Sequence, residues 1–169
     1  LQDRYLQDGD SSVSQAFARA ASAFSSNQEH ANRMYDYVYE KQWMTLATPT
    51  LSNAPQRKPE TWGRFDTDAY EDRRVGLPIS CFLNYVPDSR EGLGDHYNEN
   101  IWLASSGGGI GGYWGHVRSD GAKTSNGSQS TGSIPFIHVV DSQMLAFNQG
   151  KTRRGSYAAY MDISHPEIM

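Results

Sequence analysis

The chain has little cysteine, no long apolar run and no excess of positive charge. Cys81 is the single cysteine among 169 residues, which excludes an internal disulfide framework and makes a reducing, cytoplasmic setting the default. No segment approaches the roughly 18 apolar residues of a membrane-spanning helix, and no charged-then-apolar signal opens the chain, so we expect no membrane partner. A formal net charge of -4 gives no indication of general nucleic-acid binding.

What is present indicates a folded domain. Hydrophobic residues make up 37% of the chain, with ten Tyr, six Phe and four Trp, which excludes a disordered composition. The five histidines are scattered without ligand spacing, so we predict no metal site. The chain begins at Leu1 without a Met and stops where a helix would begin, so we expect a piece of something longer.

The first half of the chain predicts helices and then a polar loop. Apolar spacing favours a helix near residues 12–24, capped by Ser11 or Ser12, and a second over residues 27–42. The stretch LATPTLSNAP predicts a short, β-leaning segment broken by prolines. Residues 55–75 are polar and rich in turn formers, which predicts a surface loop.

The second half alternates strand and helix patterns. The expected elements are a buried strand containing Cys81, a helix capped by Asp88 or Ser89, a glycine-rich strand from residue 109, an irregular loop over 119–133, a helix opened by Pro135, a basic loop, and a strand over 157–163. Ser164 and Glu167 predict a capping box at the start of a further helix. Such alternation predicts parallel β/α units behind a helical N-terminal piece.

Three features could carry chemistry. The glycines of SSGGGIGG follow a helix and precede a strand, the reverse of a dinucleotide motif, so they indicate either close ligand approach or a tight connection. The stretch GKTRRGS suits a phosphate-bearing ligand or is a solvated basic loop. Cys81 is either a packed apolar residue, which composition alone favours, or half of a chemical pair.

Five linked stretches resemble one family. They are TPTLSNA, SCFL followed seven positions after the cysteine by DS, SSGGGIG, STGSIPFIHVVD and QGKTRRGSYAAYMDISHPEI. In order and spacing they resemble the large, catalytic subunit of ribonucleotide reductase. The resemblance implies an α/β fold, in which a helical N-terminal segment, residues 1–45, precedes the first β/α units of a ten-stranded barrel, residues 46–169.

The resemblance implies a redox role for Cys81. This residue matches the cysteine that helps to reduce the ribose and becomes half of a disulfide. Its partner, and the cysteine that carries the thiyl radical, lie further along such chains. Two electrons and a thiol proton would reach C2′ of the sugar from that dithiol. Positions that match substrate contacts are Thr48, Ser80, Cys81, Gly108 and Gly109.

The resemblance also implies an allosteric site. Asp88 and Ser89 match the site that reads effector identity, where a carboxylate accepts a hydrogen bond from a deoxyribose hydroxyl. Arg118 matches a position near the effector phosphates, and Lys123 is assigned the same role on a looser match.

A basic loop is implied to connect effector and substrate. Gln149 and Arg153 match the loop that transmits effector identity to the substrate base, with Arg154 in place of Arg153 if the alignment slips by one. Glycines flank this loop, so we expect residues 149–155 to be poorly ordered in the empty protein and to settle when both ligands bind.

The implied ligands are a ribonucleoside diphosphate substrate and a deoxynucleoside triphosphate or ATP effector. The implied partners are a second large subunit, a small subunit whose dimetal centre generates the radical, and thioredoxin or glutaredoxin acting through C-terminal cysteines outside this chain. We expect no cofactor on this segment and no reductase activity from the segment alone, because the other redox cysteines are absent.

Two alternatives remain open. The related class that uses adenosylcobalamin has similar early barrel motifs, and a non-catalytic nucleotide-binding module would share the loops without the chemistry. The stretch WGRFDTDAYEDRR departs from the short members of the family, and it leaves Arg64, Arg73 and Arg74 without a role.

Overall fold

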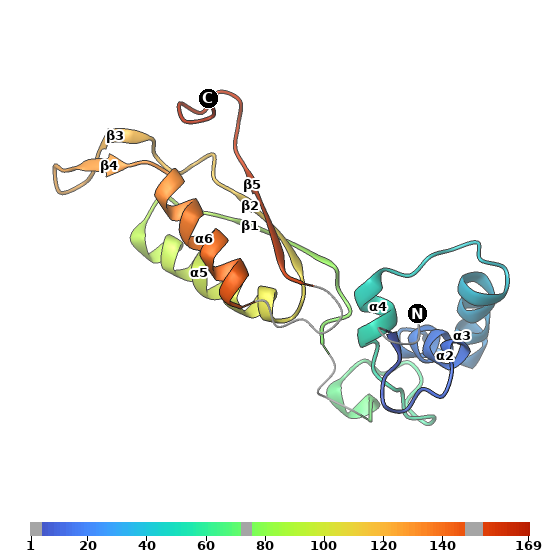
Figure 1. Cartoon of the computed structure of the whole chain (residues 1–169). Coiled ribbons are helices and arrows are strands. Elements are labelled where there is room, and N and C mark those ends of the chain that lie inside the picture. The colour runs from blue at the N-terminus through green and yellow to red at the C-terminus, as the bar shows by residue number, and fades with distance from the viewer. Residues whose placement is uncertain (1–4, 72–75, 148–153) are drawn as a thin grey trace. The chain divides into compact units, whose positions relative to one another are not determined.

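The computed structural model describes residues 5–71, 76–147 and 154–169. These residues fall into two compact units (Figure 1). The N-terminal unit extends to Ser80 and the C-terminal unit begins at Cys81.

The N-terminal unit is built from short helices. Its described elements are α2 (Val13–Ala23), α3 (Gln28–Tyr35), the π-helical turn η1 (Asp36–Glu40), α4 (Thr48–Asn53) and the 3-10 turn η2 (Thr67–Ala69). The Ser12 side chain accepts from the Gln15 amide at the start of α2, and Asn27 accepts from the His30 amide at the start of α3. Both predicted helices are confirmed, although the second changes to π-helical bonding after Tyr35.

The predicted β-leaning segment after residue 45 is wrong, because its centre forms α4. Pro49 lies in the first turn, where a missing N–H disrupts no helical hydrogen bond. Six residues are too few for a helix that is stable alone. The carbonyls at its end are bound from outside: Gln7 Nε2 donates to the Ser52 and Ala54 carbonyls at 2.9 and 3.0 Å. Tertiary contacts therefore decide the conformation here.

Arg19 is a buried charge between α2 and α4, with only 4% of its surface exposed. Its Nη2 lies 2.8 Å from a carboxylate oxygen of Asp10. Further donors reach the carbonyls of Leu51 at 3.1 Å and Ala54 at 2.5 Å, at the end of α4. The surrounding apolar cluster is formed by Ala16, Ala20, Ala23, Leu51 and Ala54. Arg19 thus satisfies backbone groups that the short helix leaves open.

The predicted surface loop is folded around a second buried arginine. Arg57 is 3% exposed and donates to the carbonyls of Ser22 and Ala23 at the end of α2. Its guanidinium carbon lies 5.1 to 5.5 Å from ring centroids of the following residues: Trp62, Phe65 and Tyr70. Arg64 forms an exposed ion pair with Asp66 at 2.9 Å. Arg73 and Arg74 lie outside the described residues.

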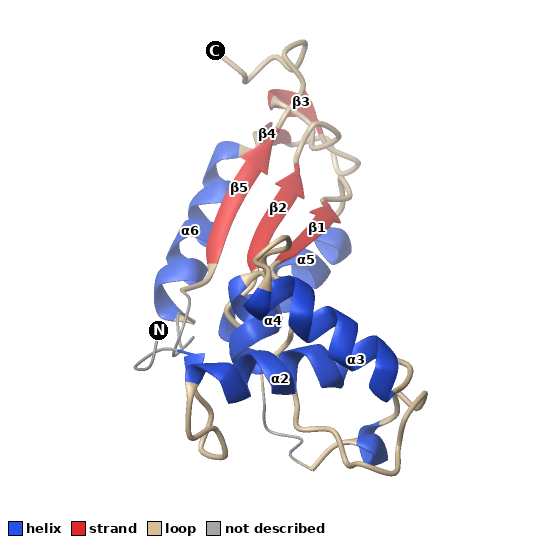
Figure 2. Ribbon diagram, turned by 90° about the vertical axis from the view of Figure 1, so that its right-hand side faces the viewer, coloured by secondary structure: helices blue, strands red, loops and turns tan. Residues whose placement is uncertain are grey.

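Parallel strands form the C-terminal unit. Its described elements are β1 (Cys81–Tyr85), α5 (Arg90–Ser105), β2 (Gly109–Tyr113), β3 (Asp120–Lys123), β4 (Gln129–Thr131), α6 (Ile134–Ala146) and β5 (Ser156–Tyr160). β2 lies between β1 and β5, and both pairings are parallel, which confirms the predicted β/α units. Helices α5 and α6 lie side by side over one face of this sheet (Figures 1 and 2).

A polar group lies inside the core between sheet and helices. His96 Nε2 lies 3.0 Å from the Tyr157 hydroxyl, which accepts from Trp114 Nε1 at 2.7 Å. His96 and Trp114 are buried, among Val86, Ala104, Ile110, Val140 and Met144. A side chain at Gly112 would collide with the Tyr157 hydroxyl. This glycine therefore makes room for the ring that joins helix to sheet.

Two predictions for the C-terminal unit are wrong. The expected irregular loop over 119–133 contains an antiparallel hairpin, β3 with β4. Glu167 does not pair with Ser164 in a capping box. Instead its carboxylate accepts from the amide and the hydroxyl of Ser133, both at 2.9 Å. Burial opposes ionisation of Glu167, but these donors outweigh it and lower the pKa of the carboxyl.

Replacing Arg19 should strongly destabilise the N-terminal unit. Arg19→Met keeps an apolar stem but leaves Asp10 buried and unpaired, so we expect a loss of about 3–5 kcal/mol in the free energy of unfolding. Denaturant titration of the chain measures this loss. The control Arg33→Met removes an exposed ion pair with Glu29 and should change it by less than about 1 kcal/mol. Equal losses in the two variants would contradict the role of Arg19.

Acid should destabilise the C-terminal unit through His96. Burial lowers the pKa of His96 to about 4, against about 6.5 in an unfolded chain. The unfolded chain therefore takes up the proton first. The stability that neutral His96 contributes is complete above about pH 6.5 and is lost as the pH falls toward 4. Denaturation midpoints measured between pH 7 and pH 4 should fall less steeply in His96→Gln, and parallel curves would refute this assignment.

Candidate functional site

The face of the sheet opposite α5 and α6 is open. Strand register places three rows of side chains on it: Cys81, Gly109 and Ser156; Leu83, Gly111 and Ala158; Tyr85, Tyr113 and Tyr160. Cys81 is exposed, as is 84% of Leu83. The prediction of a buried strand is therefore wrong for this face of β1, although the strand itself is confirmed. The same exposure removes the reading of Cys81 as a packed apolar residue in this structure.

Cys81 and the glycine run lie together. Cys81 is directly opposite Gly109 in the parallel pair β1–β2. Gly107 ends the α5 segment with a positive φ of 75°, a conformation that favours glycine. A side chain at Gly108 would collide with the Phe82 ring. The open row beside the thiol is thus backbone and small groups, which a ligand can approach closely.

Thr48 and Ser80 belong to the N-terminal unit. Thr48 is the first residue of α4, and its hydroxyl lies 3.5 Å from the Tyr5 hydroxyl. Ser80 is half-buried and immediately precedes Cys81 in the chain. The two predicted substrate hydroxyls are therefore carried by one unit and the thiol by the first residue of the other.

The predicted effector residues come together around an ion pair. Arg118 Nε lies 3.0 and 2.8 Å from the two Asp88 carboxylate oxygens, and the Arg118 amide donates to the same carboxylate at 3.3 Å. Arg118 Nη1 donates to the Lys123 carbonyl at 3.2 Å. Ser89 accepts from the Gly92 amide and caps α5. The side chains of Asp88 and Arg118 are 34% and 35% exposed, so the pair is accessible.

An aromatic group at the carboxyl ends of the strands was missed from the sequence. The His116 ring packs edge-on against both Tyr85 and Tyr113, with ring centroids 5.4 Å apart in each pair. The Tyr113 hydroxyl donates to Asp162, and this hydrogen bond raises the pKa of Tyr113. Tyr113 ends β2 and Asp162 lies two residues after β5, so the pairing of these two strands brings them together.

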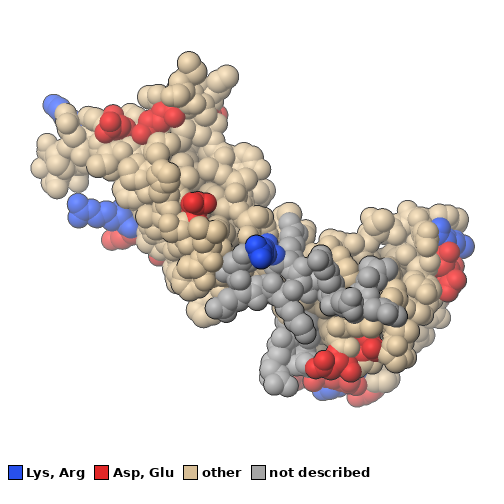
Figure 3. All heavy atoms as spheres, in the orientation of Figure 1, with Lys and Arg blue, Asp and Glu red and all other residues tan. Residues whose placement is uncertain are grey.

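Of the predicted basic loop, Arg154 is exposed and lies two residues before β5. Gln149 and Arg153 lie outside the described residues, so the expectation about loop order stays a prediction. On the face shown in Figure 3, the described charged side chains stand in small separate groups over a largely uncharged surface. The described cations therefore form no single extended basic surface on this face.

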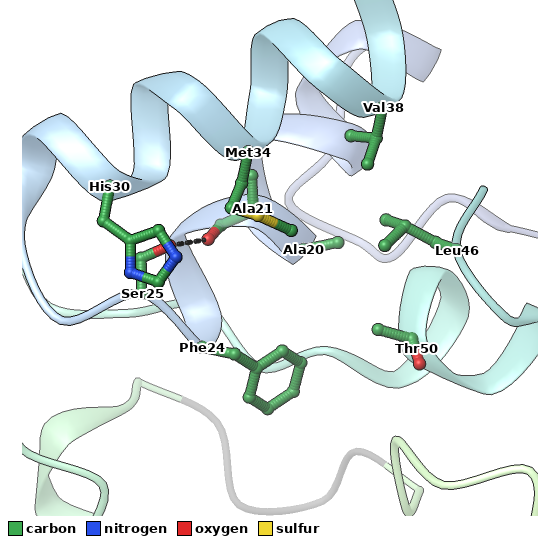
Figure 4. Close-up of a pocket in the computed structure, with 9 residues that line it drawn as sticks. All are labelled: Ala20, Ala21, Phe24, Ser25, His30, Met34, Val38, Leu46 and Thr50. Atoms are coloured by element: carbon green, nitrogen blue, oxygen red, sulfur yellow. Dashed lines mark hydrogen bonds between the residues drawn. The ribbon is translucent and has the colours of Figure 1, made fainter. Parts of the chain in front are cut away.

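The N-terminal unit contains an apolar cavity of about 140 Å³ (Figure 4). It is lined by Ala20, Ala21, Phe24, Ser25, His30, Met34, Val38, Leu46 and Thr50. Ligand sites for drug-sized molecules measure about 300–1,000 Å³ and include convergent polar groups. The cavity is thus too small and too apolar for a nucleotide.

The described residues form neither a metal-binding cluster nor a membrane-spanning helix. Among them, no three His, Cys, Asp or Glu side chains are grouped so that they could hold a metal ion. No helix among them combines the length and apolarity needed to cross a membrane.

Comparison with known proteins agrees with this geometry. Residues 79–169 match the family described as "Ribonucleotide reductase, barrel domain", and residues 1–59 match "Ribonucleotide reductase, all-alpha domain". The chain belongs to the ribonucleotide reductase large-subunit family. The barrel match begins two residues before Cys81, so it covers β1 and all later described elements.

Two relatives in this family are named as large subunits of ribonucleoside-diphosphate reductase. The chain is 45% identical over 141 residues to a "Putative ribonucleoside-diphosphate reductase large subunit" of Frog virus 3, covering 83% of this chain and 20% of that protein. It is 39% identical over its whole length to the corresponding large subunit of Invertebrate iridescent virus 3, covering 23% of it. The chain thus spans about a fifth of these relatives.

A solved structure has the same fold. The "Actinobacillus ureae class Id ribonucleotide reductase alpha subunit" superimposes with a TM-score of 0.70 at 26% identity, covering 99% of this chain and 28% of that one. This likeness confirms the predicted fold, a helical N-terminal part followed by the first units of an incomplete barrel.

Proposed function

We propose that the complete protein reduces ribonucleoside diphosphates to deoxyribonucleotides. The observation that carries this proposal is the position of Cys81, exposed at the start of the first barrel strand and opposite Gly109. Membership of the reductase family supports it, and the names of the relatives support a diphosphate as substrate.

In the proposed reaction Cys81 is one thiol of a dithiol. Its partner is a cysteine outside this chain, because Cys81 is the only one here. The dithiol supplies two electrons and two protons: the 2′-hydroxyl leaves as water, hydrogen takes its place on C2′, and the sulfurs join as a disulfide. The sugar is activated by a radical that the partner subunit generates, and thioredoxin or glutaredoxin restores the dithiol. Thr48 and Ser80 hydroxyls, with Gly108 and Gly109, hold the substrate.

The effector is proposed to bind at Asp88, Ser89, Arg118 and Lys123. Asp88 would accept from the deoxyribose hydroxyl, while Arg118 and Lys123 would face the phosphates. In this structure Asp88 and Arg118 bond to one another. An ion pair about one-third exposed contributes little stability, so a nucleotide can replace it at small cost.

Regulation is proposed to reach the substrate through Gln149 and Arg153, with Arg154 as the neighbouring candidate. A homodimer of large subunits and a separate radical-generating subunit complete the assembly. The setting proposed is the cytoplasm, where the single thiol stays reduced.

Replacing the thiol should abolish multiple turnover. In the full-length protein, Cys81→Ser removes one sulfur of the dithiol, so steady-state deoxynucleotide formation with a dithiol reductant should fall to background. Effector binding should be unchanged, because Asp88 and Arg118 are retained, and this serves as the control for folding. Wild-type rates of steady-state turnover in Cys81→Ser would exclude the redox role.

Removing the Asp88 carboxylate should weaken effector binding. Hydrogen bonds to charged groups contribute about 1.5–3 kcal/mol, so Asp88→Ala should raise the dissociation constant of a deoxynucleoside triphosphate at least about tenfold and blur substrate choice. Equilibrium titration of the full-length protein measures this. Asp95→Ala, an exposed carboxylate on α5, is the matched control and should leave the affinity unchanged. Identical affinities in wild type and Asp88→Ala would place the effector elsewhere.

A further inference from the structure

The segment that leads to Cys81 is fastened to α4 at two successive carbonyls. Thr50 Oγ1 donates to the Pro78 carbonyl at 3.1 Å, and Asn53 Nδ2 donates to the Leu77 carbonyl at 3.0 Å. These bonds join residues 28 and 24 positions apart in sequence. We refer to the two bonds together as the α4 latch.

The Asn53 amide is oriented by its surroundings. Its Oδ1 lies 3.3 Å from the Ser52 hydroxyl, which also lies 2.9 Å from the Thr48 carbonyl. This contact leaves the Nδ2 donor directed at Leu77. A Cβ on Gly76 would lie 2.9 Å from Asn53 Nδ2, closer than side chains normally approach. The glycine therefore lets the segment pass close enough for the bond to form.

Thr50 divides its side chain between two environments. It lines the apolar cavity, and Figure 4 shows its carbon arm turned toward the other lining residues with its oxygen turned away. The oxygen reaches Pro78. Two heavy atoms on Cβ leave few rotamers, so the methyl contact and the hydrogen bond fix each other.

The latch is attached to a fixed helix. Gln7 and Arg19 bind the carbonyls at the end of α4, and Arg19, which is buried in an ion pair with Asp10, thereby ties that helix to α2. The bonds from α4 to residues 77 and 78 therefore fix these two residues relative to the core of the N-terminal unit. Thr48, at the start of the same helix, shares this frame.

We propose that Thr50 and Asn53 are positioning residues for the reductase reaction. By fixing residues 77 and 78 they set where the neighbouring Ser80 lies relative to Thr48 within the N-terminal unit. Thr48 and Ser80 thereby keep a defined separation for the substrate. This inference rests on the proposed function, since it assigns Ser80 and Cys81 their roles in substrate binding and reduction.

Two substitutions at Thr50 separate a hydrogen-bonding role from packing. Thr50→Val keeps the shape and both carbon branches but removes the donor, whereas Thr50→Ser keeps the donor and loses the methyl on the cavity. Loss of one hydrogen bond should speed hydrogen exchange of amides 79–81 about tenfold in Thr50→Val. The kcat for diphosphate reduction should fall by a similar factor, and Thr50→Ser should stay near wild type in both measurements.

The experiment uses the full-length large subunit with its radical-generating partner. Exchange is read by mass spectrometry on peptides spanning residues 76–82, kcat from steady-state turnover, and effector affinity by titration. Effector affinity should not change, because the effector residues lie on other elements. Asn53→Asp, which replaces the donating amide by a carboxylate, breaks the latch independently and serves if Thr50→Val fails to fold.

The outcomes separate the possible failures. Unchanged exchange and kcat in Thr50→Val and Asn53→Asp would overturn the inference, as would a larger defect in Thr50→Ser than in Thr50→Val, which is the order that packing alone gives. Wild-type enzyme that reduces no diphosphate would overturn the proposed function instead. The exchange measurement would then still decide whether the latch holds residues 79–81.

Discussion

A buried guanidinium determines the arrangement of the N-terminal unit. Arg19 can lie inside because Asp10 neutralises it and because its other donors meet carbonyls that α4 leaves unbonded at its end. The dependence is mutual. Without Arg19 the Leu51 carbonyl of this six-residue helix loses its donor, and without α4 the arginine has a charge partner but unsatisfied donors. The residues that approach Cys81 inherit their position from this pair, through α4.

The C-terminal unit contains a parallel sheet with one covered face and one exposed face. Parallel sheets are usually covered on both faces. Here α5 and α6 cover one face, while the opposite face carries Cys81 and a row of tyrosines. Such a face suits the first strands of an incomplete barrel, a fold that the solved relative shares over 28% of its own length. The polar contact of His96, Tyr157 and Trp114 lies on the covered side, where a hydrogen bond can be kept from water.

Local signals predicted the parts of this fold that local forces decide. Ser12, Asn27 and Ser89 each cap a helix whose apolar spacing is visible in the sequence. Two of the errors share one cause, which is a contact between residues far apart in sequence. α4 depends on Arg19 from another helix, and Glu167 prefers Ser133, which lies 34 residues away, to its neighbour Ser164. Contacts between residues more than 30 positions apart leave no periodic pattern in the sequence.

The candidate site divides in the same way. Motif order predicted Cys81 and Asp88 as site residues, and strand register places Gly109 beside the thiol. The hydrogen bond between Tyr113 and Asp162 could not be read from the sequence, since it depends on how β2 and β5 align. The roles of the latch residues were also not predicted. Thr50 and Asn53 lie in the motif TPTLSNA, for which the family resemblance implies a role for Thr48 only.

The contact between Gly112 and Tyr157 limits the order in which this sequence can change. A Cβ at position 112 would fall on the Tyr157 hydroxyl, so no side chain can be accepted there while the tyrosine remains. A smaller residue at 157 would have to come first, and it would leave His96 and Trp114 without their shared partner. Each single step is therefore unfavourable in one order and blocked in the other. We therefore expect the residues at positions 112 and 157 to change together, although the two positions lie 45 residues apart in the chain.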